Sequence, residues 1–320
     1  MKDFALIGAA GYIAPRHMKA IKETGNNLVA AYDPYDGIGI MDSHFPQADF
    51  FTEAERFEDF IYKWKMDNGK PLDYISIATP NYLHKSHMRL ALAHGATAIC
   101  EKPLVLNPSD IDGLKRVEEK TGRKIYNILQ LRLHDSIVAL KEKISKELEQ
   151  DPNKVYDIDL AYLTSRGKWY FESWKGKEEK SGGLASNIGV HFYDMLSWIF
   201  GEVEENVVHL KTPFANAGYM KLKNAKVRWF LSVNYAYLPD TMKESGQRTY
   251  RSITVNGEEI EFSGGFTELH TRSYEEILKG NGFGLEEARN SIEIVSTIRN
   301  QEPVGLVGEY HPFCKKVLNG

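Results

Sequence analysis

The first 130 residues alternate short apolar runs with segments of helical period, and this alternation limits the possible folds more than any other feature. The apolar runs lie at 4–7, 28–32, 74–78, 96–100 and 124–129. Buried strands separated by helices must be joined by crossovers, which makes them parallel. The sequence therefore predicts a doubly wound parallel sheet over residues 1–130.

A glycine turn follows the first apolar run. Gly8 and Gly11 lie in it, and Ala14 stands where the next helix would pack on the sheet, a variant of the dinucleotide fingerprint. Small residues let the main chain approach a pyrophosphate at a helix N-terminus. The second run ends at Asp33, near the spacing expected for the acid that binds a ribose. This favours NAD over NADP, with a plain strand–helix turn as the alternative.

Two later runs also end in polar residues. Residues 98–100 lead into Glu101-Lys102-Pro103, where the proline keeps Lys102 out of helical geometry at a strand end. Ligands of such sheets bind at that end, although a solvated ion pair is the alternative. Residues 74–78 lead into Thr79-Pro80-Asn81, and His84 follows as either a cofactor contact or a capping histidine. Residues 34–51 show no clean period, which predicts a loop covering the adenine.

The second half changes character. A helical stripe at 137–148 precedes strands predicted at 156–163, 228–233, 251–255 and 259–262, and Asn256-Gly257 is a strong hairpin signal between the last two. These features predict a second α/β domain, residues 131–320, around a large open, mostly antiparallel sheet.

A polar stripe lies in the predicted helix at 181–194. Asn187, His191 and Asp194 have i, i+4, i+7 spacing among apolar residues. Buried polar groups need partners, so this is either a functional face or a satisfied core histidine. Imidazole titrates near neutral pH and suits a general base.

Composition narrows the possible partners. A net charge of −4 argues against general nucleic-acid binding, and two cysteines, Cys100 and Cys314, fit a reducing compartment. No run approaches the roughly 18 apolar residues of a membrane span. We therefore expect a cytoplasmic protein without nucleic-acid, membrane or metal partners.

Taken together, four motifs resemble those of the Gfo/Idh/MocA family of sugar oxidoreductases. In chain order they are Gly8-x-x-Gly11, Thr79-Pro80-Asn81-x-x-His84, Glu101-Lys102-Pro103 and Gly189-x-His191-x-x-Asp194. The resemblance covers essentially the whole chain. It implies an NAD-binding Rossmann domain over 1–130, a substrate-binding and oligomerisation domain over 131–320, and a homo-oligomer, by resemblance a tetramer.

Within the family, residues 7–17, 126–132, 164–167 and 186–194 look like the bacterial UDP-2-acetamido-2-deoxyglucuronate 3-dehydrogenases. An extra residue in the glycine turn and Asn187 in place of an acid agree with that subgroup. The implied reaction is NAD-dependent oxidation of the 3-hydroxyl of UDP-N-acetylglucosaminuronic acid, for lipopolysaccharide (O-antigen) precursors. Relatives of this kind can reoxidise bound NADH with 2-oxoglutarate, a second substrate that the resemblance implies.

The resemblance also implies residue roles. His191 is the first choice for the base and Lys102 the second, with Asn187 orienting the hydroxyl; Lys102, Asn187 and His191 also contact the substrate. Thr164, Ser165 and Arg166 would hold the uronate. The expected cofactor contacts are Gly8, Gly11, Tyr12, Ile13, Asp33, Thr79, Asn81, His84, Glu101, Lys102, Gln130, Arg132 and Trp169. Trp169 either walls the nicotinamide pocket or simply packs, and residues 250–251 and 270–272 are candidates for the uridine and diphosphate.

Two alternatives stay open. One is an NAD-dependent dehydrogenase of another sugar or cyclitol. The other is a cofactor-binding regulator without catalysis, against which the presence of both Lys102 and His191 argues.

Overall fold

The computed structural model describes residues 1–260 and 268–318, and these form two compact units. Unit 1 holds the described residues 1–130 and 268–289, and unit 2 holds 131–260 and 290–318. The sequence analysis expected the whole chain beyond residue 130 to form the second domain. Residues 268–289 instead pack with unit 1, because their apolar side chains belong to its core.

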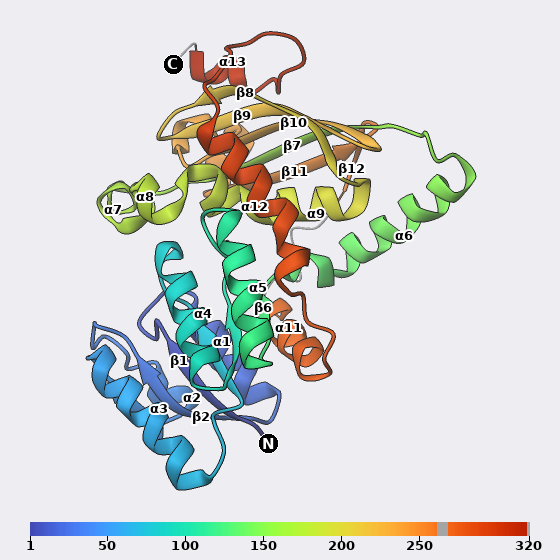
Figure 1. Ribbon diagram of the computed structural model, residues 1–320. Helices are drawn as coiled ribbons and strands as arrows, with labels where there is room; N and C mark the ends of the chain where they lie inside the picture. Colours follow the sequence, from blue (N-terminus) through green and yellow to red (C-terminus); the bar gives the residue numbers. More distant parts are fainter. Residues whose placement is uncertain (261–267, 319–320) are drawn as a thin grey trace. The chain divides into compact units, whose positions relative to one another are not determined.

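Unit 1 is built on a six-stranded sheet in the order β3-β2-β1-β4-β5-β6, with every neighbouring pair parallel (Figure 1). The strands are β1 (Asp3–Ile7), β2 (Asn27–Tyr32), β3 (Asp49–Phe51), β4 (Tyr74–Ile77), β5 (Thr97–Cys100) and β6 (Ile125–Asn127). The strand order reverses between β1 and β4, and ligands bind beyond the carboxyl ends of strands at such a switch point. The prediction of a doubly wound parallel sheet is confirmed.

The helices of unit 1 start and stop where local chemistry predicts. They are α1 (Ala14–Glu23), α2 (Met41–His44), α3 (Ala54–Asn68), α4 (His84–Ala93), α5 (Ser109–Thr121) and α11 (Leu269–Leu278), with a 3₁₀ turn at Asn81–Leu83. Pro15 lies in the first turn of α1, where a missing N–H costs nothing. Gly69 and Gly122 end α3 and α5 in left-handed geometry.

Residues 34–51 are not the featureless loop that the sequence suggested. Helix α2 buries Met41, and β3 pairs in parallel with β2. Both elements are too short, at four and three residues, to produce a readable hydrophobic period.

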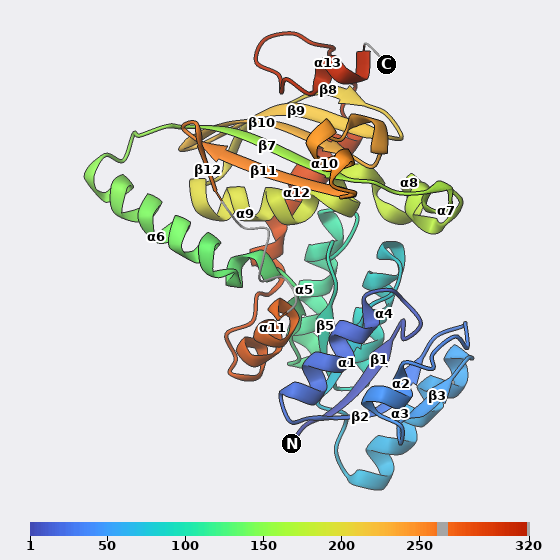
Figure 2. The same cartoon turned by 180° about the vertical axis from the view of Figure 1, so that it is seen from behind.

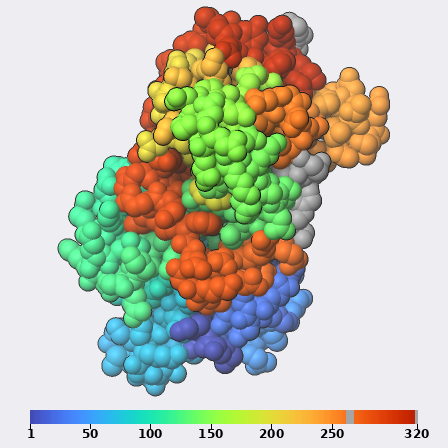
Figure 3. Space-filling model, turned by 90° about the vertical axis from the view of Figure 1, so that its right-hand side faces the viewer, coloured from blue at the N-terminus to red at the C-terminus, as the bar shows by residue number. Residues whose placement is uncertain are grey.

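Helix α11 returns to unit 1 from late in the chain. Figure 3 shows this orange-red segment against the blue N-terminal residues. Tyr274 and Ile277 join a core cluster with Phe4, Leu6 and Met18. The return therefore completes the core of unit 1.

Unit 2 is built on a second six-stranded sheet, in the order β12-β11-β7-β10-β9-β8. Its strands are β7 (Tyr156–Thr164), β8 (Val203–Lys211), β9 (Ala215–Leu222), β10 (Ala225–Ser232), β11 (Thr249–Val255) and β12 (Glu258–Glu259). Only β7 and β10 pair in parallel, so the predicted mostly antiparallel sheet is confirmed. Asn256 and Gly257 form the predicted hairpin turn, with φ of 52° and 82°. Part of the strand predicted at 259–262 lies outside the described residues.

The sequence analysis missed β8 and β9. Strand β8 is mostly half-buried and its burial does not alternate, and β9 contains Gly218. A Cβ at Gly218 would lie 2.3 Å from the carbonyl oxygen of Val207 and 2.5 Å from the Trp229 ring. Packing against a buried tryptophan therefore removes the side chain that would have signalled a strand.

The two faces of the second sheet are covered differently. The larger core cluster includes Phe192 and Leu196 of α9 (Val190–Phe200) and Val295 of α12 (Leu285–Asn300), which Figure 2 shows beside the strands. A smaller cluster on the other side includes Phe230 and Cys314. The remaining helical elements are η2 (Gln130–Leu133), α6 (Asp135–Gln150), α7 (Lys168–Glu172), η3 (Trp174–Gly176), α8 (Glu178–Ser181), η4 (Ala185–Gly189), η5 (Tyr235–Tyr237), α10 (Asp240–Glu244) and α13 (Cys314–Leu318).

None of the helices in the described part of the chain combines the length and apolar character needed to cross a bilayer.

Candidate active site

The turn after β1 can accept a dinucleotide. Gly8 has φ of +91°, and a Cβ there would lie 2.7 Å from the main chain of Ala78, so any side chain would clash. Gly11 is similarly tight, because its Cβ would lie 3.1 Å from the carbonyl oxygen of Gly8. Tyr12 is 86% exposed and Ile13 is half-buried. The turn thus has no side chain at Gly8 and Gly11, where a pyrophosphate would approach α1.

Asp33 is tied to this turn. One carboxylate oxygen accepts a hydrogen bond from the Ala10 N–H at 2.9 Å, and the other accepts from the Tyr35 N–H at 3.0 Å. The side chain is largely buried, so its direction is fixed. A carboxylate held beside the glycine turn fits ribose hydroxyls and repels a 2′-phosphate. The residues present therefore fit NAD.

The polar residues that follow β4 are Thr79, Asn81 and His84. The Thr79 hydroxyl lies 3.1 Å from His87 Nδ1, and Asn81 is buried in the following 3₁₀ turn. His84 is fully buried, with Nδ1 2.7 Å from the Pro103 carbonyl oxygen and Nε2 2.9 Å from that of Thr79. Burial lowers the pKa of His84, and the two carbonyls oppose this. Both ring nitrogens of His84 lie against main-chain carbonyls, and the cofactor contact at His84 stays a prediction.

Glu101, another predicted cofactor contact, is held by side chains of unit 1. It is 5% exposed, and its Oε1 lies 3.1 Å from His17 Nε2 and 2.7 Å from His270 Nε2, while Oε2 accepts from the Lys102 N–H at 3.2 Å. Burial alone would raise the pKa of Glu101, but the two histidines hold it well below its usual range. Lys102 is half-buried, and its peptide bond to Pro103 is cis.

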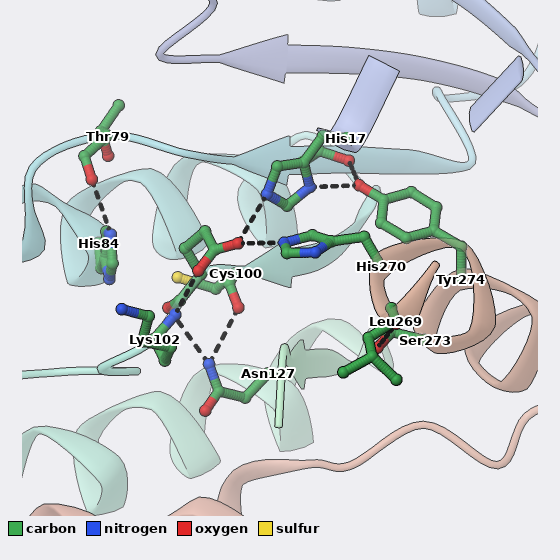
Figure 4. A network of polar contacts seen from close by, with 12 residues as sticks. His17, Thr79, His84, Cys100, Lys102, Asn127, Leu269, His270, Ser273 and Tyr274 are labelled. Carbon is green, nitrogen blue, oxygen red and sulfur yellow. Dashed lines mark hydrogen bonds and ion pairs between the residues drawn. The ribbon is translucent and has the colours of Figure 1, made fainter. Parts of the chain in front are cut away.

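The network around Glu101 continues into the core of unit 1 (Figure 4). Tyr274 OH lies 2.7 Å from His17 Nδ1 and 2.6 Å from the Ser76 hydroxyl. Burial lowers the pKa of His270, which is consistent with a neutral ring donating to Glu101. His270, a candidate for the uridine or diphosphate, is 1% exposed and bound to Glu101, and its contact with a ligand stays untested.

His17, Glu101 and His270 also place ligand-type atoms within 4.8 Å of one another, the arrangement a metal site would need. Their two N–O contacts have hydrogen-bond lengths, and the carboxylate is complete without an ion. We interpret the cluster as a hydrogen-bond network.

In unit 2, Asn187 and His191 are the two residues between Leu184 and Ser197 that are not buried. Residues Ala185–Gly189 form a π-helical turn before α9, a feature frequent at functional sites. Gly189 has no room for a side chain, because a Cβ there would lie 2.6 Å from Leu231. The Asn187 amide donates to Tyr170 OH at 2.9 Å. The π-helical turn thus holds Asn187 outward, and the first turn of α9 holds His191 outward, while their other residues pack.

Asp194 and Arg132 pair with each other. Arg132 Nε and Nη2 donate to the two carboxylate oxygens of Asp194 at 3.0 and 2.7 Å, and both side chains are buried. Burial raises the pKa of Asp194, and Arg132 opposes this. The third member of the predicted polar stripe is therefore a structural partner. The cofactor contact at Arg132 stays a prediction, and the buried Gln130 Oε1, which has no hydrogen-bond partner among the described residues, suits a ligand contact.

The predicted uronate residues differ in exposure. Thr164 and Ser165 are buried at the end of β7, with the Ser165 hydroxyl accepting from Arg248 Nη2 at 3.3 Å. Their side chains are therefore poorly placed for a ligand. Arg166 is exposed, while its N–H donates to the Val233 carbonyl at 2.9 Å. Trp169 is 56% exposed, with the Lys175 ammonium 5.4 Å from its ring.

Sequence reasoning missed the residues that support the site. Tyr170 holds Asn187, Asn127 donates to the carbonyls of Cys100 and Glu101, and His17 and His270 hold Glu101. Polar residues within predicted buried segments did indicate that such contacts exist, because each buried polar group needs a partner. The identity of the partner, more than 150 residues away for His270, was not readable.

The strand order, the glycine turn and Asp33 define a dinucleotide-binding protein of the Rossmann class. Residues 2–128 match the oxidoreductase family with an NAD-binding Rossmann fold, and residues 151–281 match the C-terminal α/β domain of the same family. The chain belongs to this family, Gfo/Idh/MocA, and its cofactor is NAD.

Solved structures extend the likeness to the whole chain. The WlbA (WbpB) dehydrogenase of Thermus thermophilus, in complex with NAD and UDP-GlcNAcA, is 50% identical over 98% of this chain and 100% of that chain, with a TM-score of 0.93. The same enzyme with NAD and alpha-ketoglutarate gives 51% identity, the same coverage and a TM-score of 0.93.

A curated relative, the 2,7-anhydro-N-acetylneuraminate hydratase of Mediterraneibacter gnavus, is 27% identical over 64% of this chain. The chain spans only half of the length of that protein, and 37% and 41% of two other curated relatives.

Proposed function

We propose that this protein oxidises the 3-hydroxyl group of UDP-N-acetylglucosaminuronic acid to the 3-keto sugar nucleotide with NAD⁺. The observation that carries the proposal is the likeness to the Thermus thermophilus dehydrogenase, whose complex holds NAD and UDP-GlcNAcA. That likeness covers 98% of this chain and 100% of that chain. The outward positions of Asn187 and His191 support it.

The chemistry follows from the side chains. Bound NAD⁺ supplies a hydride acceptor. We assign His191 to take the hydroxyl proton as the C3–H bond breaks, because a neutral imidazole accepts a proton near neutral pH. Lys102 hydrogen-bonds the reacting oxygen and is the alternative base. Asn187, whose amide donates to Tyr170, orients the hydroxyl through its carbonyl oxygen.

Arg166 is the residue that we assign to the uronate. Its guanidinium is exposed beyond β7, and arginine can grip a carboxylate with two parallel bonds. Because the Thr164 and Ser165 side chains are buried, we propose only main-chain or supporting roles for them.

The wider setting is also a proposal. A cytoplasmic homotetramer in lipopolysaccharide (O-antigen) precursor synthesis follows from the resemblance to the WlbA enzymes. Use of 2-oxoglutarate to reoxidise NADH is supported by the Thermus thermophilus complex with alpha-ketoglutarate.

The test is a substrate panel with one variant. Wild-type protein is mixed with NAD⁺ and UDP-N-acetylglucosaminuronic acid, its neutral analogue UDP-N-acetylglucosamine, or free sugars and cyclitols, and NADH formation is followed. We expect the uronate to be preferred and Arg166→Ala to reduce kcat/KM for it by about 10- to 100-fold, the loss of a charge-assisted pair. The neutral analogue should lose much less.

The exposed Lys168→Ala serves as the matched control for loss of a nearby cation. Equal losses on both sugar nucleotides would move the carboxylate site away from Arg166. Preference for a free sugar or cyclitol would replace the substrate, and NAD binding without any NADH formation would favour the regulator alternative.

A further inference from the structure

We propose that Glu101 and His84 are positioning residues that hold the main chain on both sides of Lys102, and that His17 and His270 act by fixing Glu101. The proposal rests on the function proposed above, in which Lys102 contacts the reacting oxygen. It concerns how the protein presents that lysine.

On the N-terminal side of Lys102, a buried carboxylate holds the main chain. Glu101 Oε2 accepts from the Lys102 N–H at 3.2 Å, and Oε1 meets His270 Nε2 at 2.7 Å and His17 Nε2 at 3.1 Å. His17 and His270 are 0% and 1% exposed. Rotating the carboxylate would break two buried charge-assisted hydrogen bonds, so its direction is fixed.

On the C-terminal side of Lys102, a buried imidazole contacts the main chain. His84 Nδ1 lies 2.7 Å from the Pro103 carbonyl oxygen, and Nε2 lies 2.9 Å from that of Thr79. The neutral ring donates its one N–H to one of these two carbonyls, and its other nitrogen lies against the second, so His84 sits between the segment after β5 and the segment after β4. In addition to Glu101 and His84, Asn127 contacts this segment: its side-chain amide donates to the carbonyls of Cys100 and Glu101 at 2.9 and 3.2 Å.

These contacts leave the lysine side chain as the part of the segment that faces outward. Glu101 and Pro103 are buried on either side of the half-buried Lys102, and in Figure 4 the Lys102 side chain points away from His17 and His270. The main chain of Lys102 cannot shift without breaking a buried contact. We call the contacts that Glu101, His84 and Asn127 make with this segment the frame of Lys102. A misplacement of about 1 Å at a reacting group costs roughly 100-fold in rate, and the frame prevents such a misplacement.

The frame also explains why these residues come from distant segments. His17 lies on α1 directly after the glycine turn, and His270 lies on α11, 169 positions after Glu101. One carboxylate thus joins the helix that follows the dinucleotide turn, the end of β5 and the late return of the chain. All three belong to unit 1.

The test uses three variants of the full chain. Glu101→Leu removes both acceptor oxygens, Glu101→Gln keeps one, and His84→Phe keeps a ring but removes both nitrogens. We expect Glu101→Leu and His84→Phe to lower kcat by about 10- to 100-fold while the NAD⁺ dissociation constant changes by less than about threefold. Glu101→Gln should recover part of the loss, because its remaining oxygen can still accept from the Lys102 N–H. His311→Phe, at a buried histidine of unit 2, controls for loss of a buried imidazole.

Hydrogen exchange at the Lys102 amide gives a readout that needs no substrate. Glu101→Leu should speed this exchange by about tenfold, the loss of one hydrogen bond. Wild-type kcat in both Glu101→Gln and His84→Phe, or unchanged exchange in a folded Glu101→Leu, would overturn the proposal. Failure of the proposed function looks different: wild-type protein would form no NADH from any sugar nucleotide, while the exchange measurement would still report on the frame.

Discussion

Glu101 shows at the residue scale how a buried charge is made tolerable. An isolated carboxylate in a protein interior is costly, and it persists only when its oxygens are hydrogen-bonded. Three donors, two of them imidazoles, meet its two oxygens. Burial raises the pKa of Glu101 and the histidines lower it further than burial raises it, so the ionised form is favoured.

This balance predicts an acid-dependent stability. Because the folded-state pKa of Glu101 lies below its unfolded value, its stabilisation is present above the unfolded pKa, about 4.3, and is lost as the pH falls through the folded pKa. We expect wild type to exceed Glu101→Gln by about 1 to 3 kcal/mol in free energy of unfolding at pH 7. Urea unfolding from pH 7 downwards should show this difference shrinking in acid. Glu119→Gln removes an exposed carboxylate as a control, and a pH-independent difference would contradict the prediction.

At the same scale, the sequence indicated which residues carry chemistry better than it indicated what they contact. Gly8 and Asp33 lie where the fingerprint predicts, because their roles depend on local main-chain geometry. The protein partners of Arg132 and His84 were not indicated, because they come from elsewhere in the chain. A side chain drawn to a buried partner leaves no local pattern.

At the scale of elements, glycine positions record where two elements approach closely. A Cβ at Gly189 would meet Leu231, and one at Gly218 would meet Val207 and Trp229. The first lets the π-helical turn and α9 pack on the second sheet. The second lets β9 pass under the Trp229 ring.

Gly218→Ala tests this packing. Its Cβ would lie 2.3 Å from a main-chain oxygen, which a flexible side chain cannot relieve, so we expect unit 2 to lose about 1 to 3 kcal/mol in free energy of unfolding. Gly37→Ala, where a Cβ meets nothing within 4 Å, should stay within about 0.5 kcal/mol of wild type. Urea or thermal unfolding measures both. A Gly218→Ala protein as stable as the Gly37→Ala control would show that the approach is not constraining.

Regular burial decided which elements could be predicted from the sequence. Long strands and helices with regular burial were predicted close to their observed positions, as was the hairpin at Asn256. Strand β9 was missed because small residues under Trp229 replace the apolar alternation, and β3 because three residues carry no period.

At the scale of the whole molecule, the chain divides its chemistry between two units. Unit 1 holds the NAD-fitting turn, Asp33 and Lys102, and unit 2 holds Asn187, His191 and Arg166. A sequence reading in chain order finds both sets but misses the return of α11, which brings His270 and Tyr274 to unit 1. The proposed dehydrogenation requires residues of both units to serve one reaction.

A single-turnover measurement of NADH formation from UDP-N-acetylglucosaminuronic acid, with Lys102→Met and His191→Asn beside wild type, tests that requirement most directly. The account predicts that each variant binds NAD⁺ as wild type does and forms NADH about 100-fold or more slowly, the usual loss of an acid–base group. Wild-type rates in both variants would contradict it.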